Sequence, residues 1–186
     1  MTLELTRFCF TTVEYDHLIE AGVLDEDDRV ELIEGDIIRM TPIGRRHAGC
    51  VNRLTRLLSD LASDDAQIAV QNPILLAESS EPQPDLVLMK PTVDYYSSAL
   101  PTPTDILLLV EVADSSAALD RQIKVPLYAR HGIEEVWLVD LVANTVTSFR
   151  DPTPTSYATV LEVHRGAGLT ARAFPGRGIA VSDILG

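Results

Sequence analysis

Hydrophobic and polar positions alternate along the chain with two different periods, which predicts a mixture of helices and strands. Apolar residues recur at helical spacing over about residues 12–21 and again over about residues 47–61. The first helix begins at Thr11-x-x-Glu14, a capping box in which two side chains bond to backbone N–H groups. Apolar or alternating runs predict strands over residues 67–71, 74–76, 85–89, 105–113, 135–140, 145–150 and 157–163.

Two further elements follow from turn and capping signals. Residues 29–40 predict a β-hairpin, because two alternating runs flank the turn sequence Glu34-Gly35-Asp36. Residues 116–130 predict a helix with a serine N-cap. Pro126 should bend this helix, because proline lacks the backbone donor that a helix interior requires.

The order of these elements predicts how the strands pair. Strand 105–113, helix 116–130 and strand 135–140 form a βαβ unit, so the two strands should be parallel with a right-handed crossover. Strand 85–89 is expected to be the antiparallel neighbour of strand 105–113. The sequence therefore predicts an α/β fold in one domain, residues 1–186, with a mixed central sheet flanked by helices and an N-terminal helix and hairpin.

One acidic residue, Glu111, interrupts the otherwise apolar strand 105–113. A buried charge is costly unless it is paired, hydrated or bound to a metal. In the predicted pairing, Asp85 at the start of its strand lies at the same sheet edge as Glu111. Two such carboxylates are hard oxygen ligands that suit Mg²⁺ or Mn²⁺. Lys124 on the following helix would then steady the attacking water or the scissile phosphate as a point charge.

Structural roles can explain the same residues. Pro84-Asp85 is a common turn dipeptide, and Glu111 could form a buried ion pair with Lys124 or an arginine. Lys124 could instead pair with Asp120, one turn earlier, as a solvated contact. His47 is a further candidate site residue, although a histidine at a helix start more often lies at the surface or caps the helix. The acidic residues of the hairpin, Glu31 and Glu34, are most simply explained as hairpin residues.

Composition changes this picture in one respect. The chain has 15 Lys and Arg against 28 Asp and Glu, a net charge of −13. Such a protein gains little from the counterion release that drives non-specific binding to nucleic acid. A local basic surface would have to come from four arginines, Arg45, Arg46, Arg53 and Arg56.

No feature of the sequence predicts a membrane or secreted protein. No apolar run reaches the length of a membrane helix, and residues 1–7 lack a secretory apolar region. Cys9 and Cys50 have no metal-ligand spacing, which favours two reduced thiols in a cytoplasmic protein.

A series of short motifs runs through about residues 10–185. They are Glu31-Leu-Ile-Glu-Gly-Asp-Ile-Ile38, His47, Pro84-Asp-Leu86, Val110-Glu-Val-Ala-Asp-Ser-Ser116, Asp120-x-x-x-Lys124, Leu127-Tyr-Ala129 and Glu135-Val-Trp-Leu-Val-Asp140. In their order and spacing, the motifs resemble the putative restriction endonuclease family of the PD-(D/E)xK nuclease superfamily.

The resemblance implies a restriction-endonuclease-like fold and a metal-dependent endonuclease, with DNA as the expected substrate. It implies Asp85 and Glu111 as ligands of Mg²⁺ or Mn²⁺. The superfamily pattern has a lysine two residues after the second acid, and this chain has Ala113 at that position. In related nucleases the following helix can supply that lysine, and Lys124 is placed to do so. A homodimer is expected, because nucleases of this kind often pair two sites to cut two strands.

An alternative hypothesis is a catalytically inactive nuclease-like domain that serves as an interaction or dimerisation module. The acidic composition, the small number of candidate arginines and Ala113 in place of a lysine favour it.

Overall fold

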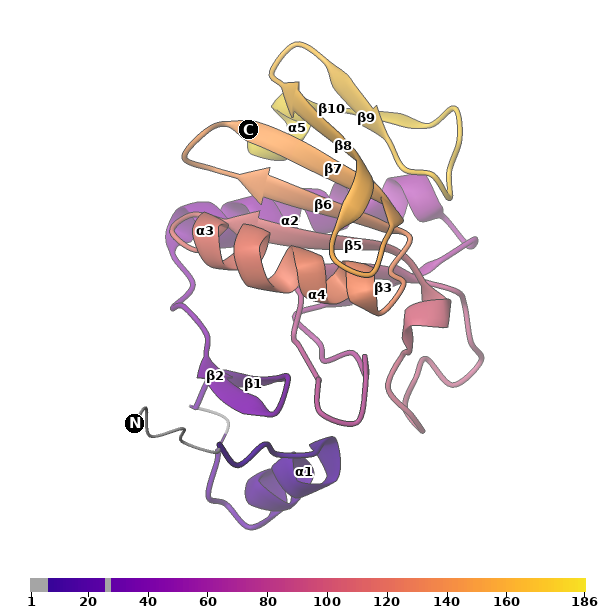
Figure 1. Cartoon of the computed structure of the whole chain (residues 1–186). Coiled ribbons are helices and arrows are strands. Elements are labelled where there is room, and N and C mark those ends of the chain that lie inside the picture. Colours follow the sequence, from indigo (N-terminus) through magenta and orange to yellow (C-terminus); the bar gives the residue numbers. More distant parts are fainter. Residues whose placement is uncertain (1–6, 26–27) are drawn as a thin grey trace.

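Strands with almost continuous apolar sequences form the centre of a six-stranded mixed sheet (Figure 1). The computed structural model describes residues 7–25 and 28–186. The strands lie in the order β3-β4-β5-β6-β7-β8. Their bounds are β3 (Gln67–Val70), β4 (Leu86–Met89), β5 (Ile106–Ala113), β6 (Glu135–Asp140), β7 (Thr145–Pro152) and β8 (Tyr157–His164). The predicted fold class, a mixed sheet flanked by helices, is confirmed.

The pairing at the centre of the sheet is the predicted one. Strands β4 and β5 are antiparallel, with Leu86 opposite Val110. Strands β5 and β6 are parallel, with Glu111 opposite Leu138. The start of β4 therefore lies beside the carboxyl end of β5. This is the edge at which open α/β sheets usually place their ligands.

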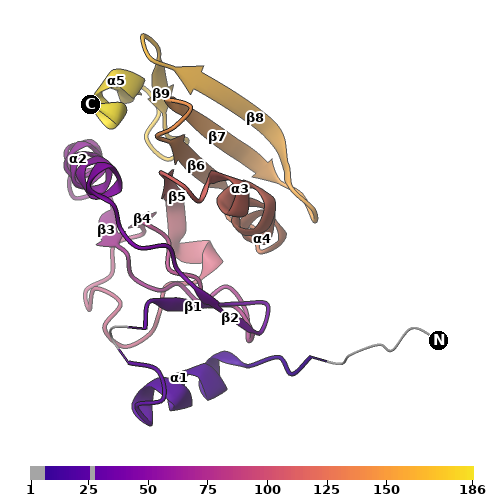
Figure 2. The same ribbon diagram turned by 90° about the vertical axis from the view of Figure 1, so that its left-hand side faces the viewer.

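Helices cover both faces of the sheet, as Figure 2 shows. On one face, α2 (Arg45–Ala62) and α5 (Val181–Leu185) share a core with Trp137, which is fully buried. On the other face, α4 (Val125–Arg130) packs through Leu127 and Tyr128. The central strands β4, β5 and β6 are buried on both sides, which explains their near-continuous apolar sequences.

The crossover between β5 and β6 differs from the single bent helix that the sequence predicts. It consists of α3 (Ala117–Leu119), a π-helical turn η2 (Asp120–Lys124) and α4. The Val125 N–H bonds to the Asp120 carbonyl, five residues earlier. Pro126 follows this turn and occupies the first turn of α4, where its missing donor costs little. Wider π turns of this kind often occur at functional sites.

The N-terminal region folds into α1 (Thr12–Glu20) and a hairpin of β1 (Val30–Ile33) and β2 (Asp36–Arg39), which lie beneath the sheet in Figure 1. The capping box of Thr11 and Glu14 is present. The turn residues Glu34 and Gly35 have φ of 50° and 84°, as a tight hairpin turn requires. A Cβ on Gly35 would lie 2.5 Å from the Cys9 Cβ, so glycine is also needed for space.

In the remaining chain, one predicted strand is absent and one hairpin had no counterpart in the prediction. Residues 74–76 form no strand, although Ile74 and Leu76 are buried, because the N–H groups of the three residues bond to carbonyls of loop residues, Pro82, Pro101 and Ser80. A second small hairpin of β9 (Gly168–Thr170) and β10 (Gly178–Ala180) was not predicted. Its strands are three residues long, too short for a clear alternating pattern.

None of the helices formed by residues 7–25 and 28–186 has the length and apolar character needed to span a membrane. The prediction that residues 1–7 contain no secretory apolar region falls mostly on residues 1–6, which lie outside the described chain.

Candidate active site

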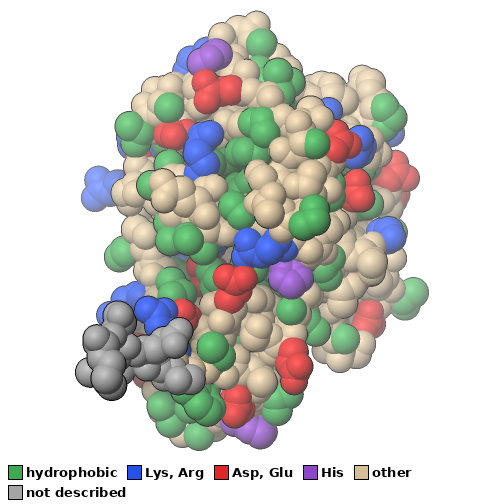
Figure 3. Space-filling view, viewed as in Figure 1, with side chains coloured by type: hydrophobic (Ala, Val, Ile, Leu, Met, Phe, Trp, Pro, Cys, Tyr) green, Lys and Arg blue, Asp and Glu red, His purple; other side chains and the backbone are tan. Residues whose placement is uncertain are grey.

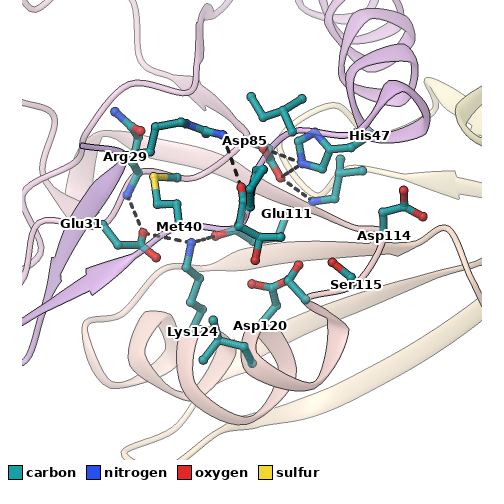
Figure 4. A pocket seen from close by; sticks show the side chains of 18 residues that line it. Arg29, Glu31, Met40, His47, Asp85, Glu111, Asp114, Ser115, Asp120 and Lys124 are labelled. Atoms are coloured by element: carbon teal, nitrogen blue, oxygen red, sulfur yellow. Dashed lines mark hydrogen bonds and ion pairs between the residues drawn. The ribbon is translucent and has the colours of Figure 1, made fainter. Parts of the chain in front are cut away.

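A cavity of about 230 Å³ opens where the carboxyl end of β5, the hairpin and the π-helical turn meet (Figure 4). Its lining includes the four candidate site residues of the sequence, which are His47, Asp85, Glu111 and Lys124. They come from α2, the residue before β4, β5 and η2 respectively. The fold therefore brings all four to one place.

Asp85 is held by several donors. Its carboxylate accepts a hydrogen bond of 2.8 Å from the Val112 N–H and one of 3.2 Å from the Gln71 amide. The His47 Nε2 lies 3.0 Å from the same carboxylate. Asp85 is 8% exposed. These contacts fix the orientation of the Asp85 carboxylate toward β5. A residue that only forms a turn would not need so many partners.

Glu111 is buried near the end of β5 and shares its Oε1 between two donors. The Lys124 ammonium lies 3.2 Å from this oxygen, and the Tyr128 hydroxyl donates to it at 2.6 Å. Burial raises the pKa of Glu111 to about 8, with Lys124 opposing the shift. Tyr128, which the sequence analysis did not select as a site residue, thus orients this carboxylate from α4.

Lys124 forms ion pairs with two carboxylates, Glu111 and Glu31, and the Glu31 Oε2 lies 3.0 Å from its Nζ. Figure 4 shows its ammonium between the two acids. Burial disfavours the ammonium, but the charges of Glu111 and Glu31 outweigh this effect and hold the pKa of Lys124 above its usual range. The buried ion pair with Glu111, one of the structural alternatives, is present.

Glu31 is the residue whose position differs most from expectation. The sequence suggested an ordinary hairpin residue, yet Glu31 is 3% exposed and lines the cavity. Glu34 behaves as expected, because it lies at the surface and pairs with Arg130. One feature of the sequence could have indicated that Glu31 is buried. It interrupts the apolar run Val30-Glu-Leu-Ile33, as Glu111 interrupts its own strand.

The alternative in which Lys124 pairs with Asp120 as a solvated contact is not what the structure shows. Both residues are buried in the π-helical turn, and Asp120 accepts a hydrogen bond of 2.6 Å from the Ser116 hydroxyl. Within the described chain, the ion pairs of Lys124 go to Glu31 and Glu111. Burial raises the pKa of Asp120.

His47 does not cap its helix. The N-cap of α2 is Gly44, and no side chain caps it. The His47 side chain is 14% exposed and contacts Asp85, and this hydrogen bond raises the pKa of His47. Its Nδ1 is buried and has no hydrogen-bond partner among residues 7–25 and 28–186.

Carboxylates outnumber cations around the cavity. The acidic lining residues are Glu31, Asp85, Glu111, Asp114 and Asp120, and the basic ones are Arg29 and Lys124, with His47 beside them. Such an excess of negative charge at the mouth of a cavity attracts cations.

The donor set fits Mg²⁺ or Mn²⁺. The fit concerns two carboxylates, because no group of three or more His, Cys, Asp or Glu in the described part of the chain is arranged to hold a metal. Mg²⁺ needs only one or two protein carboxylates, because water and substrate phosphate complete its coordination. Asp85 and Glu111 can supply these two, since both line the cavity.

The arginines of α2 do not form a continuous basic surface. Arg46 pairs with Asp114, Arg53 donates to the Ile184 and Leu185 carbonyls, and Arg56 pairs with Asp60. On the face that Figure 3 shows, basic and acidic side chains are interspersed.

A mixed sheet with two carboxylates and a lysine gathered at the end of its central strand is typical of the restriction-endonuclease-like class. The model of one family, Uma2, described as a putative restriction endonuclease, matches residues 12–182. The chain belongs to this family.

The fold is also that of a solved structure, a putative nuclease belonging to DUF820 from Anabaena variabilis. The two chains share 16% sequence identity with a TM-score of 0.75, and the match covers 95% of this chain and 97% of the other. Among curated proteins, none matches the chain.

Proposed function

We propose that this protein is a metal-dependent endonuclease that hydrolyses phosphodiester bonds, with DNA as its substrate. The observation that carries the proposal is the position of Lys124, whose ammonium lies 3.2 Å from Glu111 in a cavity that Asp85 also lines. A lysine directed away from the two acids would have favoured an inactive domain. Family membership supports the same conclusion.

Asp85 and Glu111 would hold the metal, Mg²⁺ or Mn²⁺. When bound, such a metal lowers the pKa of a coordinated water and neutralises charge that develops on phosphate. The protein supplies the orientation of both ligands. The Val112 N–H and His47 direct Asp85, and Tyr128 directs Glu111.

Lys124 would act on the phosphate and the attacking water. Its ammonium has three donors, and it stays protonated because two acids surround it. Hydrolysis forms a P–O bond to the water oxygen and breaks the P–O bond to the leaving oxygen, which takes up a proton. A fixed positive charge stabilises the negative charge that gathers on the phosphate oxygens during this step. Lys124 therefore fills the role of the lysine that Ala113 cannot supply.

The acidic surface restricts how the substrate binds. With a net charge of −13, few phosphates can be neutralised by the protein. We expect a short contact centred on the cavity and a weak salt dependence of binding. A homodimer would pair two such sites, one for each strand of a duplex.

One assay tests the proposal. Native protein and Glu111→Ala are incubated with plasmid and single-stranded DNA, with and without Mg²⁺ or Mn²⁺, and metal binding is measured by calorimetry. We expect metal-dependent cleavage by the native protein and none by Glu111→Ala, while Glu34→Ala on the hairpin surface cleaves normally. A native protein that binds neither metal would contradict the proposal.

The alternative, an inactive domain that serves in interaction or dimerisation, is favoured by Ala113 and by the arginines of α2 that are engaged within the protein. The same assay separates the two functions. Metal-dependent nicking that disappears in Glu111→Ala excludes the inactive domain.

A further inference from the structure

Two buried glutamates hold Lys124, and only one of them belongs to the proposed metal site. The Lys124 Nζ lies 3.0 Å from the Glu31 Oε2 and 3.2 Å from the Glu111 Oε1. All three side chains are almost completely buried, with exposed fractions of 6%, 2% and 4% for Lys124, Glu31 and Glu111. A single ion pair would satisfy the lysine charge, so the second carboxylate needs a separate explanation.

Glu31 is fixed by the hairpin independently of the lysine. The backbone N–H of Gln83 donates to its Oε2 at 3.1 Å, and β1 pairs Glu31 with Ile38 of β2. Loop residue Glu81 also exchanges backbone hydrogen bonds with Leu32, the next residue of β1. The Glu31 carboxylate therefore remains in place whether or not Lys124 is bound to it.

Glu111 has competing partners in the proposed function. Its Oε1 already accepts hydrogen bonds from Lys124 and Tyr128. A divalent cation that binds Glu111 repels the ammonium and competes with it for the carboxylate. A buried lysine with Glu111 as its single partner would then lose its counter-charge, which is strongly unfavourable. Such a lysine would resist metal binding or leave the site.

We propose that Glu31 is a positioning residue that holds Lys124 in the site when Glu111 binds the metal. This inference rests on the proposed function, because it assumes that Glu111 is a metal ligand. It assigns a role to the N-terminal hairpin, which supplies the second anchor for a lysine carried by the crossover between β5 and β6. Glu31 itself touches Lys124 and need not touch the metal.

The test is a cycle of variants with Mn²⁺ affinity, measured by calorimetry, as the readout. The four proteins are native, Glu31→Gln, Lys124→Met and the double variant. We expect Glu31→Gln to weaken Mn²⁺ binding roughly tenfold, within the range of coupling between contacting residues. In the Lys124→Met background, Glu31→Gln should change Mn²⁺ affinity by less than about twofold, because the competing ammonium is gone.

Matched controls separate this role from a general loss of negative charge. Asp120→Asn removes another buried carboxyl from the same cavity, but from a residue that forms no ion pair with Lys124 in the described chain. The effect of Asp120→Asn on Mn²⁺ affinity should depend less on Lys124 than that of Glu31→Gln does, because Asp120 acts on the ammonium through its charge without forming an ion pair with it. Glu34→Gln, on the surface of the same hairpin, should leave Mn²⁺ affinity unchanged. Circular dichroism on each variant confirms that it is folded.

Each outcome decides the inference. Equal weakening by Glu31→Gln in both backgrounds, or no weakening in either, overturns it while leaving the metal site intact. A native protein that binds no Mn²⁺ overturns the proposed function itself, and with it this role of Glu31. A Glu31→Gln effect that disappears in the Lys124→Met background, while the Asp120→Asn effect differs less between the two backgrounds, supports the inference.

Discussion

Two neighbouring parallel strands each carry a buried glutamate, and the two residues have very different surroundings. Glu135 begins β6 and is fully buried. Its carboxylate accepts five hydrogen bonds, two of them from the Arg150 guanidinium, and the other donors are the Trp137 indole, the Ser148 hydroxyl and the Arg172 N–H. Glu111 lies near the opposite end of the pair, in β5, and receives hydrogen bonds from Lys124 and Tyr128.

The difference shows how a structural charge is distinguished from a functional one. Glu135 has an arginine and three further donors, and together they join β6, β7 and the segment after β9. Glu111 shares its one lysine with Glu31 and lines a cavity. A buried carboxylate is satisfied when donors occupy its oxygens, and it attracts a cation when they do not. Burial alone would not have separated the two.

The largest expected effect is on catalysis. Glu111→Gln should abolish Mn²⁺ binding and reduce DNA cleavage by at least about a thousandfold, because a metal ion contributes several kcal/mol to the barrier. Its melting temperature should remain close to that of the native protein. Calorimetry and a plasmid assay measure the two effects. Cleavage by Glu111→Gln at the native rate would show that Glu111, like Glu135, has a structural role and no role in catalysis.

Glu135→Ala should show the opposite pattern. It leaves the Arg150 guanidinium without a carboxylate partner and removes the acceptor of several other buried donors, so we expect a loss of roughly 3 kcal/mol in the free energy of unfolding. For a chain of this size, that loss lowers the melting temperature by about 6–12 °C. Urea unfolding and calorimetry measure it. The folded fraction should still bind Mn²⁺ normally, and weakened Mn²⁺ binding would show that the two glutamates are coupled.

Lys124→Met tests the cation that Glu111 shares. Cleavage should fall about a hundredfold, the effect of removing one donor that stabilises developing negative charge. Mn²⁺ should raise the melting temperature of Lys124→Met more than that of the native protein, because no ammonium competes for Glu111 and a ligand stabilises the state it binds. Thermal unfolding with and without Mn²⁺ measures this difference. An equal rise in both proteins would contradict competition between lysine and metal.

Glu81 is another buried carboxyl, outside both clusters, and its substitution has the smallest expected effect. It is 8% exposed, and its side chain has no hydrogen bond within residues 7–25 and 28–186. Burial raises the pKa of Glu81 from 4.5 to about 7, with the charge of Asp16 adding to the shift. The folded protein thus binds this proton more tightly than the unfolded chain, so the contribution to stability is complete below pH 4.5 and is lost as pH rises through about 7.

Glu81→Gln should therefore stabilise the protein by about 1–3 kcal/mol at pH 8 and have little effect near pH 4.5. Urea unfolding at the two pH values measures the difference, and Glu78→Gln in the same loop is the control. A stabilisation that is equal at both pH values would show that protonation of Glu81 is not its cause.

Much of the fold could be predicted because local patterns and general pairing rules determine it. The alternation of apolar residues placed the strands, and the βαβ rule set β5 and β6 parallel. With β4 antiparallel to β5, these rules also predicted that Asp85 and Glu111 would share one sheet edge, where both now line one cavity. The π-helical turn and the irregular residues 74–76 could not be predicted, since contacts with distant segments decide them.

The sequence by itself determined most of the strands, the pairing around β5 and the four candidate residues that gather at the end of β5, because spacing along a strand or helix is a local property. Tertiary structure alone decided which charges meet. Glu31 and Glu34 are three residues apart in one hairpin, yet one is buried against Lys124 and the other pairs with Arg130 at the surface. His47 likewise faces Asp85 instead of solvent. The packing of the hairpin and α2 against the sheet edge produces these contacts, and no local pattern records which side chain will find a partner far along the chain.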